Sequence, residues 1–266
     1  MSDYPPRPSL LARIRDRVLG AARPPSTAAT PPDTVIYAIG DIHGRFDLLD
    51  EITGLVVADS RHRLASHRVI VCLGDYVSRG ADSRRVIDRL VAPPPPGFER
   101  VTLKGNHEDL LLRFIDGDLD SARHWFDYGG IDTIAHYGVV IANREARGDQ
   151  ALEDLRRGLV AAMPPSHLAF LRKLQISHAA GDYYFVHGGV RPGVPLAEQS
   201  EFDRMWIRGP FLNSDADHGA VIVHGHSIAM QPQRRHNRIG IDTGAYRSGV
   251  LTCLVVDGTD CSFLQT

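Results

Sequence analysis

Short runs of apolar, mostly β-branched residues alternate with helical periods in the first part of the chain. The first run, Val35 to Ile39, ends at Gly40 and is typical of a fully buried strand. The same pattern predicts further strands at 68–73 and 101–104, and helices at 45–59, 82–91 and 107–115. Strand–helix–strand alternation of this kind indicates a largely parallel sheet covered by helices.

The alternation of strands and helices stops between residues 118 and 180, where the apolar residues recur with a helical period. We interpret this stretch as an insertion over one edge of the core, with Trp125, Phe126 and Tyr128 among its packing residues. Strands resume afterwards, at 183–187, 220–224, 237–242 and 250–256. Their close spacing and glycine turns predict antiparallel pairing and allow a second sheet.

The first 33 residues differ from the rest because prolines flank a single short amphipathic segment, 10–19. We expect residues 1–33 to form a Pro-rich flexible N-terminal segment and residues 34–266 to form the ordered domain. The chain contains 43% hydrophobic and 23% charged residues, which is ordinary for a globular protein.

The charge and cysteine patterns exclude several classes of function. A net charge of -2 gives no electrostatic case for a nucleic-acid partner. The three cysteines lack C-x-x-C spacing, which favours a reducing compartment. No apolar stretch reaches the roughly 20 residues that span a bilayer, so we expect no transmembrane segment and a cytoplasmic location.

Five polar clusters stand where predicted strands end. They are Gly40-Asp41-Ile42-His43-Gly44, the segment from Gly74-Asp75 to Ser78-Arg79-Gly80, Gly105-Asn106-His107-Glu108, His187-Gly188-Gly189 and His224-Gly225-His226. One such cluster alone is usually a turn or a helix cap. Ligands bind at the carboxyl ends of strands in open α/β sheets, so five clusters at five strand ends predict a shared site.

The residue types in these clusters suit divalent metal ions. Aspartate, histidine and asparagine are ligands for Mn²⁺, Fe²⁺ or Zn²⁺, and no thiolate is required. Asp41 and His43 alternate in an extended segment, so both side chains can face one ion. Two ions need a bridging carboxylate, and the central Asp75 is the natural candidate.

In this order, the clusters resemble the phosphoprotein phosphatase family of the calcineurin-like metallophosphoesterases. The family pattern is G-D-x-H-G, G-D-x-x-D-R-G, G-N-H-E and two separate histidines, and the resemblance covers residues 35–257. The chain looks most similar to bacterial serine/threonine protein phosphatases. The resemblance implies an α/β fold, a metallophosphoesterase-type β-sandwich flanked by helices. The catalytic domain would be 34–266, with a mainly helical insertion at 118–180 over the active-site side.

The resemblance also implies roles for individual residues. Metal ligands would be Asp41, His43, the bridging Asp75, Asn106, His187 and His226. His226 is preferred to His224 because Gly225-His226-Ser227 matches the family's G-H-T, although the exchange of the two stays open. His107 matches the general acid, Arg79 and Arg208 match the phosphate-binding arginines, and Tyr246 would line the pocket.

One position departs from the family pattern. Ser78 stands where the family has an aspartate that orients the acid histidine. Because that aspartate is not a metal ligand, the metal site is expected to persist. The departure puts the strength of His107 as an acid in doubt.

The resemblance implies a phosphomonoester hydrolase, and specifically a protein phosphatase, in which water activated between two divalent ions attacks directly. Mn²⁺ is the expected metal, with Fe or Zn as alternatives, and the partner is a phosphorylated protein or a small phosphoester. A dinucleoside polyphosphate or other phosphoanhydride hydrolase on the same metal core remains an alternative. A phosphate-binding pseudoenzyme ranks below both, because every proposed ligand is present.

Overall fold

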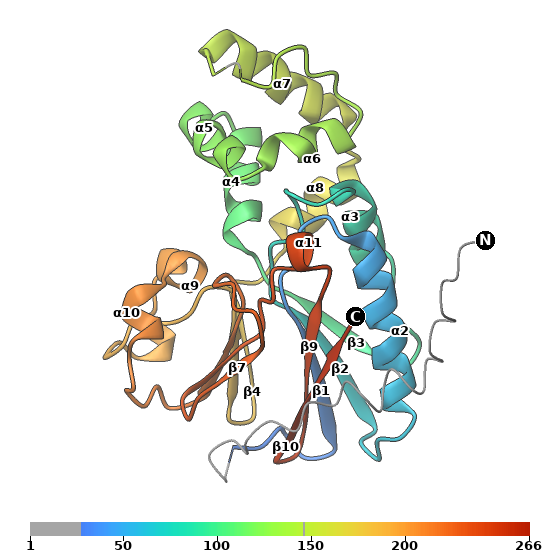
Figure 1. Cartoon of the computed structure of the whole chain (residues 1–266), viewed down its shortest axis with the longest axis vertical. Coiled ribbons are helices and arrows are strands. Elements are labelled where there is room, and N and C mark those ends of the chain that lie inside the picture. The colour runs from blue at the N-terminus through green and yellow to red at the C-terminus, as the bar shows by residue number, and fades with distance from the viewer. Residues whose placement is uncertain (1–27, 146) are drawn as a thin grey trace, which may run out of the picture.

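In the computed structural model, which describes residues 28–145 and 147–266, the chain folds around two five-stranded sheets packed face to face (Figure 1). The first sheet has the order β10-β9-β1-β2-β3, and the second has the order β4-β5-β6-β8-β7. The first sheet comprises β1 (Thr34–Ile39), β2 (His67–Cys72), β3 (Glu99–Thr102), β9 (Thr252–Asp257) and β10 (Asp260–Gln265). The second comprises β4 (Ser177–Ala180), β5 (Tyr183–Val186), β6 (Val221–His224), β7 (Gln233–Arg234) and β8 (Arg238–Gly240).

Alternation along the strands explains why the two sheets form a sandwich. In β1, Ile36 and Ala38 point inward and pack with Phe185 and Val223 of the second sheet. The residues between them, such as Tyr37, point outward into the larger cluster beneath the helices. Both faces of β1 are therefore buried, which accounts for its continuous apolar sequence. The fold class predicted from the sequence is confirmed.

Helices cover the outer face of each sheet. The first sheet carries α2 (Phe46–Ser60), α3 (Ser83–Val91) and α4 (Asn106–Ile115). The outer face of the second sheet packs against α9 (Glu201–Trp206) and α10 (Gly209–Leu212), which follow the short helix η1 (Leu196–Glu198). The last helix, α11 (Ala245–Ser248), lies between β8 and β9 in the chain.

Four helices occupy the stretch 118–180. They are α5 (Leu119–Asp127), α6 (Gly130–His136), α7 (Asp149–Ala162) and α8 (Pro165–Arg172), and they extend above the sandwich in Figure 1. A partly buried network ties them to the core, because His167 Nε2 is 2.9 Å from Asp88 Oδ1 and His167 Nδ1 is 2.9 Å from the Tyr137 hydroxyl. The helical stretch is therefore anchored to α3 by polar contacts.

Two expectations about the later part of the chain were wrong. β5, β6 and β8 pair in parallel rather than antiparallel, because α9, α10 and the loops after β6 return the chain to the same end of the sheet each time. Antiparallel pairing is confined to β4 and β7 at the edges and to β9 and β10 in the first sheet. Tyr128 is not a packing residue, since half of its surface, 50%, is exposed.

The N-terminal segment is described only from residue 28. Thr30 exchanges hydrogen bonds with Gly258, and the backbone N–H of Ala29 donates to Asp182. Residues 1–27, which make up most of the segment expected to be flexible, lie outside the described residues. Among the helices described, none is long and apolar enough to cross a membrane.

Candidate metal centre

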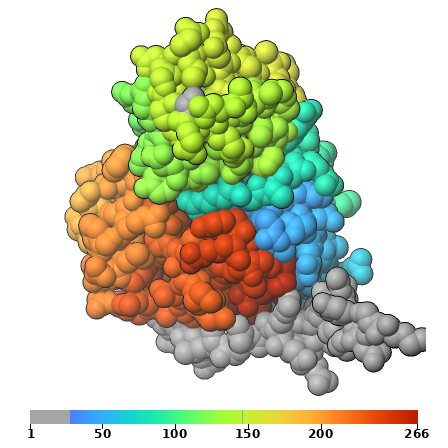
Figure 2. Space-filling view, turned by 45° about the horizontal axis from the view of Figure 1, so that its top comes forward, coloured from blue at the N-terminus to red at the C-terminus, as the bar shows by residue number. Residues whose placement is uncertain are grey.

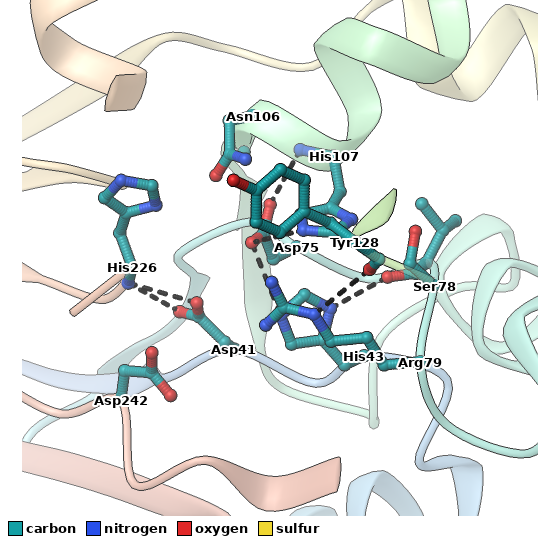
Figure 3. A network of polar contacts seen from close by, with 12 residues as sticks. Asp41, His43, Asp75, Ser78, Arg79, Asn106, His107, Tyr128, His226 and Asp242 are labelled. Atoms are coloured by element: carbon teal, nitrogen blue, oxygen red, sulfur yellow. Dashed lines mark hydrogen bonds and ion pairs between the residues drawn. The ribbon is translucent and has the colours of Figure 1, made fainter. Parts of the chain in front are cut away.

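The carboxyl ends of six strands meet at one place and bring together the candidate ligand side chains predicted from the sequence, together with Asp242. The loops after β1, β2 and β3 bring Asp41, His43, Asp75, Asn106 and His107, and those after β5, β6 and β8 bring His187, His226 and Asp242. Figure 3 shows several of these side chains around Asp75, with Asp41 and Asp242 on one side and Arg79 on the other. The sandwich therefore brings together the carboxyl ends of strands from two separate sheets.

Asp75 lies at the centre of the group. Its Oδ2 atom is 3.4 Å from His43 Nε2, and its Oδ1 atom is 3.4 Å from His187 Nε2. Two sets of potential ligand atoms share this carboxylate, with all atoms of a set within 4.8 Å: His43–Asp75–His107 and Asp75–His187–His226. Each oxygen of the Asp75 carboxylate faces a different one of these two sets. This is the geometry expected of a carboxylate that bridges two ions.

Backbone carbonyls fix the histidine tautomers. His43 Nδ1 lies 2.9 Å from the Val77 carbonyl, and His187 Nδ1 lies 3.0 Å from the Leu73 carbonyl. Each ring therefore holds its proton on Nδ1 and turns an unprotonated Nε2 toward Asp75. His226 Nε2 is buried and has no hydrogen-bond partner among the described residues. A buried orphan nitrogen beside a carboxylate fits a metal ion.

Asn106 and Asp41 complete the predicted ligand set. Asn106 Oδ1 is 3.0 Å from His187 Nε2, at the N-terminus of α4. The Asp41 carboxylate accepts the backbone N–H of His226, at 3.0 and 3.2 Å. His224 lies elsewhere, with its ring 5.1 Å from that of Phe211, so the geometry groups His226 with the other ligands.

Burial dominates the electrostatics of the centre. Desolvation lowers the pKa of His43 and His226 and brings the pKa of His187 to about 4, so these rings are neutral. Desolvation, together with Asp242 and Asp75, raises the pKa of Asp41. Neutral imidazoles beside clustered carboxylates form a donor set that divalent cations would stabilise. The residues present therefore fit the metals that the fold implies.

The backbone is strained at the same place. Six non-glycine residues in the described ranges have positive φ, and five of them belong to the centre: His43, Asp75, Ser78, Arg79 and His226. Such conformations cost about 1–3 kcal/mol each and persist only where the surroundings enforce them. Gly105 is required for a different reason, the close approach of Asp75, since a Cβ there would lie 2.2 Å from Asp75 Oδ1.

The fully buried carboxylate of Glu108 holds the centre together. Its Oε2 atom accepts the backbone N–H groups of Asp75 and Gly105 at 2.8 and 3.0 Å. Its Oε1 atom accepts those of Tyr76 and Val77 at 2.8 and 3.2 Å. Burial and the neighbouring Asp75 raise the pKa of Glu108, whereas the four donors favour the ionised form. Glu108 thereby ties the loop after β2 to the start of α4.

Two arginines and a tyrosine surround the centre. Arg79 Nη1 is 2.9 Å from His43 Nε2, and its guanidinium lies 4.9 Å from the centre of the Tyr246 ring. The Tyr246 ring also packs edge-on against His43 at 5.5 Å. Arg208 lies in the link between α9 and α10. Burial raises the pKa of Asp75 to about 7 and lowers the pKa of His226, and the positive charge of Arg208 acts to lower both. Both arginines are thus placed to act on an anion at the centre.

The helical insertion holds the Ser78–Arg79 turn in its left-handed conformation. The Trp125 indole N–H donates to Ser78 Oγ at 2.9 Å, and the Ser78 backbone N–H donates to Thr133 Oγ1 at 2.9 Å. The Gly129 carbonyl accepts the backbone N–H of Arg79 at 3.2 Å, and the Tyr128 carbonyl accepts its Nε–H at 3.3 Å. Ser78 therefore contacts the insertion, and His107 Nδ1 is buried without a hydrogen-bond partner among the described side chains.

Sequence reasoning placed every predicted ligand at this centre but missed several of its neighbours. Asp242 follows strand β8, so the rule that found the other five clusters would also have found it. Glu108 was part of a quoted motif without a role of its own. No sequence feature pointed to Trp125 and Tyr128 as neighbours of the centre. A helical period predicts a helix, but it does not show which of its aromatic residues contact a distant turn.

Comparison with known proteins agrees with this centre. The calcineurin-like phosphoesterase family matches residues 34–238, which is most of the chain. The chain therefore belongs to the calcineurin-like phosphoesterase family and is a metallophosphoesterase hydrolase. The family uses divalent metals, and the two sets of ligands around Asp75 could hold them.

Named relatives include two kinds of phosphatase. The chain is 29% identical to the bis(5'-nucleosyl)-tetraphosphatase PrpE [asymmetrical] of Anoxybacillus flavithermus, over 81% of this chain and 88% of the relative. It is 26% identical to the protein of the same name from Bacillus thuringiensis, with the same coverage. It is also 28% identical to the Shewanella-like protein phosphatase 2 of Arabidopsis thaliana, over 65% of this chain and 52% of the relative.

The four hydrogen bonds to Glu108 make a direct prediction. In Glu108→Gln the amide would turn its own N–H donors toward two of the four backbone donors, which would lose their acceptor. Each buried unpaired group costs about 1–3 kcal/mol, so we expect Tm to fall by about 5–10 °C. Calorimetry on the mutant and on Glu99→Gln, an exposed glutamate, tests this. Equal melting of both would show that Glu108 does not organise the loops.

The contact between Trp125 and Ser78 makes a second prediction. Trp125→Phe keeps an aromatic ring but removes the indole donor, which loosens the turn that carries Arg79. We expect the inhibition constant for phosphate to rise about fivefold while metal content per chain is unchanged. Ser78→Ala should have little further effect in the Trp125→Phe background, because both changes break the same bond. Full additivity of the two effects would contradict a shared mechanism.

Proposed function

We propose that this metallophosphoesterase hydrolyses a phosphoanhydride bond in a small substrate of the dinucleoside polyphosphate class. The observation that carries the proposal is the buried Nδ1 atom of His107, which has no hydrogen-bond partner among the described residues. Ser78, at the position where the family pattern has an aspartate, accepts a hydrogen bond from Trp125 instead. The remaining nitrogen of His107, Nε2, faces Asp75 at 4.0 Å.

A poorly oriented acid restricts the choice of leaving group. Hydrolysis of a serine phosphate releases an alkoxide, which needs a well-placed proton donor in the transition state. Hydrolysis of an anhydride releases a phosphate, which is already stable as an anion. The unpartnered His107 is therefore better matched to anhydrides than to serine phosphates.

The other residues have separate tasks in this proposal. Asp41, His43, Asp75, Asn106, His187 and His226 would hold two divalent ions, with Mn²⁺ the expected metal. When bound, such ions activate water and neutralise charge on the phosphoryl group. Arg79 and Arg208 would bind the phosphoryl oxygens through paired N–H groups. The ring of Tyr246, which lies 4.9 Å from the Arg79 guanidinium, would hold that group in position.

The relatives support the same choice. Proteins named asymmetrical bis(5'-nucleosyl)-tetraphosphatases align with 81% of this chain and extend over 88% of their own length. The match therefore includes the insertion as well as the metal core.

A protein phosphatase is the second candidate, as the motifs of the sequence first implied. The relative named Shewanella-like protein phosphatase 2 favours it, although the match covers only 65% of this chain and 52% of the relative. Both candidates use the same centre, so the substrate has to distinguish them.

The test compares two substrates on the Mn²⁺-loaded full-length protein. We expect kcat/KM for diadenosine tetraphosphate to exceed that for a serine phosphopeptide by at least about a hundredfold, a difference of ~2.7 kcal/mol in transition-state stabilisation. Asp75→Asn should abolish both activities, which checks that they come from this centre. A higher kcat/KM for the phosphopeptide would refute the proposal and favour a protein phosphatase.

A further inference from the structure

Four aromatic rings form a continuous row that leads outward from the metal centre. Trp206, on α9, packs edge-on against the proposed ligand His226 at 6.4 Å. Its ring stacks on Phe202 at 6.0 Å with an interplanar angle of 14°, and it lies 5.8 Å from the ring of His124. His124 packs against Tyr128 at 4.9 Å. We call Phe202, Trp206, His124 and Tyr128 the aromatic row.

Three members of the aromatic row are exposed, whereas Trp206 is half-buried and packs partly against the core. Phe202 is 63% exposed and Tyr128 is 50% exposed, and His124 is exposed as well. These rings come from two segments far apart in the chain, α5 with the residue after it and α9. In the space-filling view the green insertion adjoins the orange segment that carries α9 (Figure 2). Exposed apolar surface shared by two such segments is characteristic of a binding surface rather than of a core.

The row is continuous with the phosphate-binding part of the centre. Tyr128 belongs to the network of polar contacts around the centre (Figure 3), because its carbonyl accepts a hydrogen bond from Arg79 Nε at 3.3 Å. In the chain, Arg208 follows Trp206 by two positions. A ligand that extends from the metal centre past Arg79 would therefore reach the row at Tyr128.

We propose that the aromatic row is a nucleobase-binding subsite. Along one path the order of groups in the protein is the candidate metal ligand His43, then Arg79, then the exposed residue Tyr128. A nucleoside polyphosphate has the matching order: the phosphate that reacts, further anionic phosphates, then a planar base. Aromatic rings bind bases by stacking, and such binding tolerates different bases because every base has a π-face.

Other aromatic or phosphorylated ligands fit the row less well. The ring of an aryl phosphate is attached directly to the reacting phosphate, so it would stay beside Tyr128 or Tyr246 and would not extend to Phe202. A phosphopeptide would reach Phe202 but offers a planar ring only in some sequences. A base separated from the reacting phosphate by a ribose and further phosphates satisfies both the distance and the chemistry.

This inference rests on the proposed function but can be tested separately by binding. Calorimetric titration of the Mn²⁺-loaded protein would compare adenosine 5'-diphosphate with ribose 5-diphosphate, which lacks the base. We expect the nucleotide to bind about tenfold more tightly, the gain typical of one stacked base. Phe202→Ala should remove most of that difference, and Phe202→Leu should do the same because it keeps an apolar side chain but not the π-face. Leu64→Ala, at an exposed position outside the row, should preserve it.

The outcomes separate the two claims. Equal affinity for the nucleotide and the sugar phosphate, or a base preference that survives both Phe202 substitutions, would overturn the subsite. A serine phosphopeptide that binds more tightly than the nucleotide and loses this advantage in Phe202→Ala would also overturn it, since the row would then hold a peptide. Failure to hydrolyse diadenosine tetraphosphate, with nucleotide binding intact, would refute the proposed function alone.

Discussion

The arrangement of the centre depends on the buried carboxylate of Glu108. By accepting four backbone N–H groups it fixes the loop after β2 against the start of α4. That contact positions Asp75, Asn106 and His107 relative to one another before any ion is bound. The His107 backbone N–H then donates to Asp75 Oδ1 at 3.0 Å, which orients the carboxylate that both sets of ligands share. The buried carboxylate of Glu108 thus determines the relative positions of three side chains of the centre.

The sandwich supplies the rest of the geometry. Three parallel strands in each sheet end at the same edge, so ligands separated by more than a hundred residues meet across the interface between the sheets. Positive φ at His43, Asp75 and His226 turns the backbone sharply enough for their side chains to face one another. The cost of this strain is offset by the packing and hydrogen bonds of the buried strands around it.

The sequence was sufficient to predict which polar residues meet at one place and much of the fold, because both are encoded locally. Apolar runs such as Val35 to Ile39 define buried strands, and polar residues directly after them define the site. It could not predict how β5, β6 and β8 pair, since parallel and antiparallel strands share one local pattern. Nor could the sequence predict that Trp125 contacts Ser78 or that Tyr128 is exposed near the centre, because both features depend on how the insertion packs on the core. Ser78 stands where the family pattern has an aspartate, and this difference is explained only by the hydrogen bond from Trp125, which the sequence does not show.

The most direct test of the account is the number of ions at Asp75 and their coupling. Metal-free protein would be titrated with Mn²⁺, with bound metal per chain measured by mass spectrometry and the spin coupling by electron paramagnetic resonance. A carboxylate that bridges two ions predicts two Mn²⁺ per chain and an exchange-coupled spectrum. One ion per chain, or two ions with independent spectra, would contradict a shared bridging ligand and with it the central role assigned to Asp75.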